Sequence, residues 1–252
     1  MNRTLYPKSG TAAGWIVYKN YGDGDVNLVW TAGSGASDVT MIHPYGTTQW
    51  AGGNYLEFRG LKLDGQNQAG NGIFCQRSHH LRFIGNTIKN MGAMGLGTWY
   101  SDYITADSNQ ITHNGYLQGW SSGLSFNSTQ WYDTFAGFHN FVVNNIISGT
   151  FDGSTHHSDG HAIIMDVSNG TYDPASANTP RTLIANNVVY ENGGRCLVIF
   201  TVTNIWIVNN TCYKNGLDRA MNYAPSFSTN SSRDGLFINN RNDFGKTPPT
   251  KS

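Results

Sequence analysis

The sequence is poor in charged residues, in proline and in cysteine, and it contains no long hydrophobic run. Only 13% of its 252 residues are charged, and 16 basic side chains balance 16 acidic ones. A formal net charge of zero argues against a nucleic-acid-binding protein that depends on positive charge. No run of 18 apolar residues is present, so no membrane partner is expected, and the residues after Met1 lack the apolar segment of a signal peptide.

The cysteines are also too few to hold a fold together. Cys75, Cys196 and Cys212 lie far apart in the sequence, and none belongs to a C-x-x-C motif. A disulfide-rich scaffold or a zinc knuckle requires more cysteines than this. We therefore expect all three to be small buried apolar side chains.

Glycine and asparagine are abundant, with 30 and 28 residues respectively. Both favour turns and left-handed backbone, so a mostly helical protein is excluded. An apolar content of 38%, with 13% aromatic residues, is too high for a disordered chain. The length is sufficient for a domain with its own core, and the composition predicts an all-β fold with many turns.

A short β-prone segment that ends in asparagine recurs along the chain. Its terminal asparagines are 23, 36, 42, 23 and 30 residues apart. About 23 residues can hold three strands and three turns, which is one coil of a parallel β-helix, and the longer intervals are coils with insertions. Asparagines at the same corner of successive coils would form a hydrogen-bonded ladder. A β-sandwich is the alternative, but its turns would recur about every 8–12 residues without this period. The segments are Leu81–Asn86, Tyr103–Asn109, Phe141–Asn145, Leu183–Asn187, Ile205–Asn210 and Leu236–Asn240.

These segments resemble the right-handed parallel β-helix proteins of the pectate-lyase-like superfamily, over about residues 50–242. The resemblance implies a single right-handed parallel β-helix of about seven or eight coils over residues 1–242, with a C-terminal tail over 243–252. Residues 10–22 resemble the coil that follows a capping helix in such proteins; the helix itself is missing, so we expect an N-terminally shortened chain. The resemblance also implies a secreted, monomeric protein that binds polysaccharide.

Four insertions lengthen the central coils, and insertions on a solenoid commonly build its binding face. They lie at Gly115–Ser122, Ser128–Gly137, Thr150–Gly160 and Ser168–Pro180. Aromatic, weakly charged loops suit carbohydrate, because the C–H faces of sugars stack on aromatic rings. The alternative is that the same rings only pack the loops onto the coils. The rings in question are Trp120, Trp131, Tyr132, Phe135, Phe151, His156, His157 and Tyr172.

The third strand of each coil predicts which side chains point inward and which point outward. Large apolar residues recur at alternate positions, and neighbours in one column of stacked strands are about 4.8 Å apart. Asp166 should therefore lie beside Asn127 and Phe200, and His161 beside Arg195. The predicted inward columns are Ile73, Leu96, Leu124, Ile163 and Leu197, and Cys75, Thr98, Phe126, Met165 and Ile199. The predicted outward columns are Gln76, Trp99, Asn127, Asp166 and Phe200, and Asn71, Met94, Ser122, His161 and Arg195.

The polar segment that leads into one of these strands, Ser158–Asp166, resembles the Ser-Asp-Gly-x-Gly-Ile-Ile-x-Asp motif of many bacterial β-helix proteins, with Ala162 in place of a glycine. A polysaccharide lyase that cleaves an acidic polysaccharide by β-elimination is the function we favour. Asp159 and Asp166 would then hold Ca²⁺ together with main-chain oxygens, and no organic cofactor is expected. The predicted catalytic residues are Asp166, Asp159, His161, Arg195 and His139, and the predicted substrate contacts are Trp99, Asn127, Trp131, Phe200 and His157.

Two other functions remain open at this stage. A glycoside hydrolase would use Asp159 and Asp166 as its two carboxylates, which requires a turn that brings them together. A non-catalytic polysaccharide-binding or adhesion module would use the same surface without chemistry. Both aspartates also have an ordinary structural explanation, Asp159 as part of an Asp-Gly turn and Asp166 as the end of a strand. The zero net charge is unfavourable for a groove that binds a polyuronate.

Overall fold

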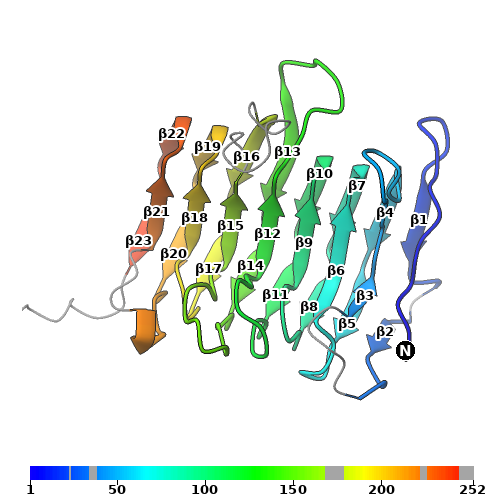
Figure 1. Cartoon of the computed structure of the whole chain (residues 1–252), viewed down its shortest axis with the longest axis horizontal. Coiled ribbons are helices and arrows are strands. Elements are labelled where there is room, and N and C mark those ends of the chain that lie inside the picture. The colour runs from blue at the N-terminus through cyan, green and yellow to red at the C-terminus, as the bar shows by residue number, and fades with distance from the viewer. Residues whose placement is uncertain (23, 34–38, 168–178, 222–225, 244–252) are drawn as a thin grey trace, which may run out of the picture.

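The computed structural model describes residues 1–22, 24–33, 39–167, 179–221 and 226–243. Over these residues the chain consists of β-strands, turns and one short 3-10 helix, Arg219–Met221. No helix in the described ranges is long and apolar enough to cross a membrane. Figure 1 shows the strands stacked side by side along one axis, from β1 at one end of the molecule to β22 at the other.

The strands form three parallel sheets, and each coil contributes one strand to each sheet. The first sheet contains β1 (Ile16–Lys19), β4 (Leu56–Arg59), β7 (His79–Ile84), β10 (Asp102–Asp107), β13 (Phe138–Val143), β16 (Arg181–Ala185), β19 (Thr203–Val208) and β22 (Arg233–Ile238). The second contains β2 (Val26–Val29), β5 (Leu61–Asp64), β8 (Thr87–Lys89), β11 (Gln110–Thr112), β14 (Ile146–Ser148), β17 (Val188–Tyr190), β20 (Thr211–Tyr213) and β23 (Arg241–Asp243). The third contains β3 (Thr40–Ile42), β6 (Asn71–Gln76), β9 (Leu96–Trp99), β12 (Leu124–Asn127), β15 (Ile163–Asp166), β18 (Leu197–Phe200) and β21 (Phe227–Asn230).

This arrangement confirms the predicted single parallel β-helix, since sheets of eight, eight and seven strands correspond to about eight coils. The last described strand, β23, extends to Asp243, one residue beyond the predicted end of the helix. Residues 244–252 of the predicted tail lie outside the described residues. The same holds for residues 168–178 of the fourth predicted insertion, including Tyr172.

The core lies inside the coils, where the predicted inward columns are found. The strand register pairs Leu124 with Leu96 on one side and with Ile163 on the other. Phe126 is likewise paired with Thr98 and with Met165. All six side chains are buried. Stacking one apolar side chain on the next in every coil removes these surfaces from water along the whole helix.

The predicted asparagine ladder is present at the corner between the first and second sheets. Asn145 is typical: its Nδ2 donates to the carbonyl of Ala106 at 2.9 Å and to Oδ1 of Asn187 at 3.0 Å. Its own Oδ1 accepts from the backbone N–H and from Nδ2 of Asn109, both at 2.9 Å. The preceding Asn144 is exposed and has φ 58°. Each Asn-Asn pair thus supplies a left-handed turn residue and then a buried ladder residue.

The structure corrects the prediction for the cysteines. All three are buried as predicted, but Cys196 and Cys212 form a disulfide bond, and only Cys75 is a free thiol. Cys196 directly precedes β18 and Cys212 lies in β20, so their Cα atoms are 5.8 Å apart although 16 residues separate them in the sequence. The reason is that the coil returns the chain to the same corner, a proximity that cysteine spacing alone does not reveal.

Candidate functional site

A groove of about 1000 Å³ runs over the outer face of the third sheet. Its floor includes Ser125, Ile164 and Val198, which are paired across β12, β15 and β18 and point outward. The predicted outward column forms one of its sides, because Asp166 is paired with Asn127 and with Phe200 in the strand register. The groove lining includes Trp99, Asn127, Asp166, Phe200, Asp159, His161 and Arg195.

Asp159 is brought to the groove by a tight loop over residues 150–160. The Asp152 carboxylate organises this loop by accepting from the backbone N–H of Ser154 and Ser158 at 3.0 Å and from that of Asp159 at 3.3 Å. Gly160 follows with φ +71°, and a Cβ there would lie 2.5 Å from the backbone nitrogen of Asp152. Only glycine fits this position, so the Asp-Gly dipeptide serves both the turn and the placement of Asp159.

The two groove carboxylates are harder to ionise than ordinary aspartates. Burial raises the pKa of Asp159 to about 6, and the nearby charge of Asp152 adds to the effect. Burial also raises the pKa of Asp166 to about 6, helped by the charge of Asp159. The charge of Asp159 thus reaches Asp166, and near pH 6 each carboxyl group is partly protonated.

His161 is held in one tautomer beside these carboxylates. Its Nδ1 accepts a hydrogen bond from the backbone N–H of Arg195 at 3.0 Å, so in the neutral ring the proton is on Nε2. Burial lowers the pKa of His161 to about 3, and the Arg195 charge lowers it further. The Nε2 atom lies 4.0 Å from Oδ1 of Asp159. A neutral ring with Nε2 protonated suits a hydrogen-bond donor.

Arg195 is the single lysine or arginine among the described residues that line the groove. Its Nε is buried and has no hydrogen-bond partner within the described chain. Burial lowers the pKa of Arg195, while the charge of Asp159 opposes that change. The groove therefore combines two acidic groups with one partly buried cation.

The donor set was compared with the needs of calcium, which takes six to eight oxygen ligands. Asp159 and Asp166 are two carboxylates, and within the ranges that the structure describes no group of three or more His, Cys, Asp or Glu side chains could hold a metal ion. Asp152 is engaged by the loop that it organises. The side chains of Asp159 and Asp166 alone fall short of the ligands that calcium needs, and no reaction step is assigned to calcium below.

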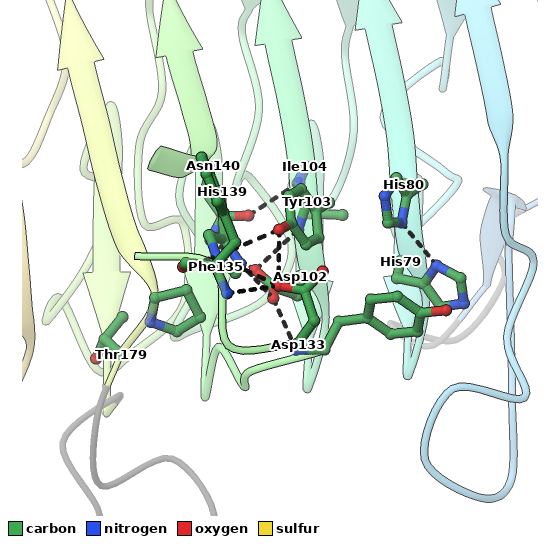
Figure 2. A network of polar contacts seen from close by, with 12 residues as sticks. His79, His80, Asp102, Tyr103, Ile104, Asp133, Phe135, His139, Asn140 and Thr179 are labelled. Carbon is green, nitrogen blue, oxygen red and sulfur yellow. Dashed lines mark hydrogen bonds and ion pairs between the residues drawn. The ribbon is translucent and has the colours of Figure 1, made fainter. Parts of the chain in front are cut away.

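Three of the predicted site residues, His139, Trp131 and His157, are not part of the groove lining. His139 is at the start of β13 in the first sheet, and Figure 2 shows it beside Asp102 and Tyr103. Its Nδ1 is 2.7 Å from Oδ2 of Asp102, and its Nε2 is 2.6 Å from the carbonyl of Phe135. The indole of Trp131 packs edge to face against the His139 ring at 5.0 Å. The insertion Ser128–Gly137 thus packs its aromatic residues onto the first sheet.

The surroundings of His139 show that it is a structural group. Both ring nitrogens face acceptors, an arrangement that favours the doubly protonated, charged form of the ring. Burial opposes this charge, but the Asp102 carboxylate outweighs burial and raises the pKa of His139. Both side chains are fully buried, which leaves no access for a substrate. His139 is therefore separated from the groove residues with which the sequence grouped it.

His157 is also directed away from the groove. Its Nδ1 forms an ion pair with Asp218 at 2.9 Å, and this partner raises the pKa of His157. Sequence reasoning missed Asp152 as the organiser of the loop and Phe74 and His43 as lining, whereas Trp120, one of the rings expected in the insertions, does line the groove. An Asp-Gly-Ser turn motif marks Asp152. Phe74 lies two residues before Gln76 on β6, at a further outward position that the two predicted outward columns do not include.

The chain is similar in structure to several solved proteins. An alginate lyase from Paenibacillus sp. str. FPU-7 superposes with a TM-score of 0.50 at 17% identity, over 94% of this chain and 84% of that one. Pectate lyase Pel9A gives a TM-score of 0.46 at 15% identity, over 95% of this chain and 50% of that one. A mannuronan C-5 epimerase module from Azotobacter vinelandii gives 0.31 at 11% identity, over 87% and 75%.

At the level of sequence, no protein-family model matches the chain and no curated protein is significantly similar to it. At identities this low the structural likeness concerns the fold alone. The predicted resemblance is nevertheless confirmed for the fold. The three parallel sheets and the asparagine ladder are the features that the sequence predicted for a parallel β-helix. By fold, the chain is a single right-handed parallel β-helix.

Proposed function

We propose that this chain is a carbohydrate-active enzyme that cleaves a glycan lying along the groove, with Asp159 and Asp166 as its acid–base pair. The observation that carries the proposal is the shared groove of two carboxylates whose pKa values are both raised to about 6. Two interacting carboxyl groups that hold one proton provide a general acid and a general base at the same pH. The fold shared with an alginate lyase supports a carbohydrate as the substrate.

Hydrolysis is the reaction that this pair supports best. The protonated carboxyl group would donate to the glycosidic oxygen, while the ionised one would activate water or attack the sugar. His161, as a neutral donor beside Asp159, would help to position the substrate. With one cation against two carboxylates, the groove is poorly suited to a chain that carries a negative charge on every sugar.

A second candidate, the β-elimination predicted from the sequence, is favoured by Arg195. Its buried Nε has no partner among the described residues and could neutralise one substrate carboxylate. An ionised aspartate of the pair would then remove the proton from the carbon next to that carboxylate, the bond from the following carbon to the glycosidic oxygen would break, and the protonated aspartate would donate its proton to that leaving oxygen. The screen described next includes Ca²⁺ and a chelator, so it also measures whether any such cleavage depends on calcium.

The experiment is a cleavage screen with two readouts. Neutral glycans are assayed for new reducing ends, and acidic polysaccharides for the ultraviolet absorbance of unsaturated ends, each with Ca²⁺ and with a chelator. We expect reducing ends without absorbance, in either condition. Absorbance that requires Ca²⁺ would establish the lyase in place of the hydrolase.

Variants connect any activity to the groove. Asp166→Asn and Asp159→Asn should each reduce the cleavage rate by about 100-fold or more, the usual contribution of a general acid or base. Asp25→Asn is the control, since Asp25 is exposed and pairs with Lys62 on the second sheet. Full activity in both groove variants would contradict the proposal. Binding of a glycan without any cleavage would instead support a non-catalytic polysaccharide-binding module.

We also propose that the protein acts outside the cell. The disulfide between Cys196 and Cys212 supports an oxidising compartment, since such bonds are rare in the cytosol. A polymeric glycan substrate agrees with this location. Detection of the chain in the culture medium of its source, with both cysteines oxidised, would test it.

A further inference from the structure

Aromatic residues line the part of the groove on the amino-terminal side of the acid–base pair. In the outward column, Asn127 is one coil from Asp166 and Trp99 is two coils away. Phe74, on the next coil, contacts the Trp99 ring edge to face at 5.8 Å. His43 follows, 5.5 Å from the Phe74 ring. These rings form a continuous aromatic row along the axis of the helix.

Two exposed tryptophans face this part of the groove from its opposite edges. Trp99 ends β9, at the edge where the strands of the third sheet finish, and its side chain is 42% exposed. Trp120 precedes β12, at the edge where those strands begin, and is 71% exposed. The His156 ring supports Trp120 from one side at 4.3 Å. Since burying aromatic surface is favourable, these two exposed rings do not serve to pack the loops onto the coils.

This half of the groove carries no formal charge on its described lining. The residues contributed by the coils of β3, β6 and β9 include no Asp, Glu, Lys or Arg. Burial lowers the pKa of His43, so its ring is neutral at pH 7. The charged lining residues, Asp159, Asp166 and Arg195, all come from the segments around β15 and β18. The aromatic half therefore offers stacking surfaces and no partner for an anionic sugar.

We propose that this aromatic half is a binding platform for uncharged sugar units, on the amino-terminal side of the cleaved bond. The inference rests on the proposed function, because the acid–base pair fixes where cleavage occurs. Coils are about 4.8 Å apart, close to the length of one sugar unit in an extended glycan chain. Trp99 then contacts the sugar about two units from the pair, and Phe74 the next. The substrate is a neutral glycan long enough to reach them.

The test is a binding measurement with oligosaccharides of increasing length. Neutral β-1,4-linked xylo-, manno-, cello- and chito-oligosaccharides of two to six units, and oligogalacturonates of the same lengths, are titrated by calorimetry. We expect one neutral series to bind about 10-fold or more tightly as a hexamer than as a dimer, a gain that stacking on aromatic rings can supply. Trp99→Ala should bind the hexamer as weakly as the dimer.

Two further variants make the result specific. Trp120→Ala should also weaken hexamer binding, and this loop residue does not contribute to the core. Trp206→Ala is the matched control: Trp206 is 36% exposed but lies in β19 of the first sheet, outside the groove. The platform is refuted if Trp99→Ala and Trp120→Ala bind like the wild type, if only oligogalacturonates bind, or if no series gains affinity with length.

The binding experiment is independent of the reaction. If Trp99→Ala loses its affinity for the hexamer although the wild type cleaves nothing, the platform is supported and the proposed hydrolysis fails. If the wild type cleaves a neutral glycan and Trp99→Ala shows the same dependence on chain length, the platform fails and the hydrolysis remains.

Discussion

Burial determines the chemistry of individual side chains in this molecule. Asp159 and Asp166 have raised pKa values because they lose water in the groove, whereas His161 becomes neutral for the same reason. His139 shows the opposite outcome, because a buried carboxylate next to it stabilises its charge. The pKa values of two histidines in one sequence are thus shifted in opposite directions, and only their surroundings explain the difference.

The first prediction concerns the cost of keeping Asp166 in the groove. Its pKa is raised from 3.8 to about 6, so the ionised form is less stable in the folded chain than in the unfolded one. The stability that protonated Asp166 contributes to the folded chain is therefore lost as the pH rises from about 4 to about 6. We expect Asp166→Asn to be more stable than the wild type by about 1–2 kcal/mol at pH 7. Near pH 3.5 the two should be equal.

Urea unfolding at both pH values measures this difference. A variant that is less stable than the wild type at pH 7 would show that Asp166 holds the fold together. It would then contradict the assignment of a carboxylate that is kept for function at the expense of stability.

The second prediction concerns the buried ion pair of His139 and Asp102. His139→Gln leaves the Asp102 carboxylate without its cation, which costs about 3 kcal/mol or more. Since the folded pKa of His139 is raised, its contribution is complete below about pH 6.5 and is lost as the pH rises through the folded value. The difference between variant and wild type should therefore shrink at alkaline pH.

Unfolding experiments from pH 6 to pH 9 test this, with the other charged neighbours, His80, Arg82 and Asp133, left in place. His113→Gln is the control, because His113 is exposed. Equal stability of His139→Gln and the control at pH 6 would refute the ion pair as a stabilising contact.

At the level of elements, the corners of the coils determine how the strands stack. Left-handed residues end the strands that precede each corner: Asn144, Asn186, Asn209 and Asn239 occupy equivalent positions at the corner of the ladder. The asparagine that follows each of them is hydrogen-bonded to the coils on both sides, or at the end of the ladder to one side. The ladder satisfies the backbone groups of a buried turn, which would otherwise be costly.

The third prediction compares the two members of one Asn-Asn pair. Asn145→Ala leaves the carbonyl of Ala106 and the donors of Asn109 unpaired in the core, and should cost about 3 kcal/mol or more. Asn144→Gly keeps the left-handed turn at an exposed position and should change stability by less than about 1 kcal/mol. Chemical denaturation of both variants tests the assignment, and similar losses in the two would refute it.

At the scale of the whole molecule, the fold assembles a groove from segments that are distant in sequence. Asp159 comes from a loop between β14 and β15, Asp166 from the end of β15, and Arg195 from the loop that precedes β18. The strand register places the last two on adjacent coils. The groove therefore works as a unit, and its pH dependence should be that of the interacting pair and not of either aspartate alone.

The fourth prediction is the pH profile of glycan cleavage. The active form carries one proton on the Asp159–Asp166 pair, and both groups have a pKa of about 6. Activity should therefore rise and then fall, with its maximum near pH 6, because the pair is doubly protonated below this range and fully ionised above it. Initial rates measured from pH 4 to pH 9 test this, and a rate that stays constant from pH 5 to pH 8 would exclude the pair as the acid and base.

The sequence by itself determined the fold, the asparagine ladder and the columns of side chains on the third sheet. These features repeat once per coil, so every coil of the sequence carries independent information about them. The position of Asp166 between Asn127 and Phe200 followed from this repetition. The tertiary structure alone decided what does not repeat: the pairing of Cys196 with Cys212, the separation of His139 and Trp131 from the groove, and the entry of Trp120 into it. Loop direction, cysteine proximity and the charge of a buried group depend on neighbours that are distant in sequence, and no local pattern encodes them.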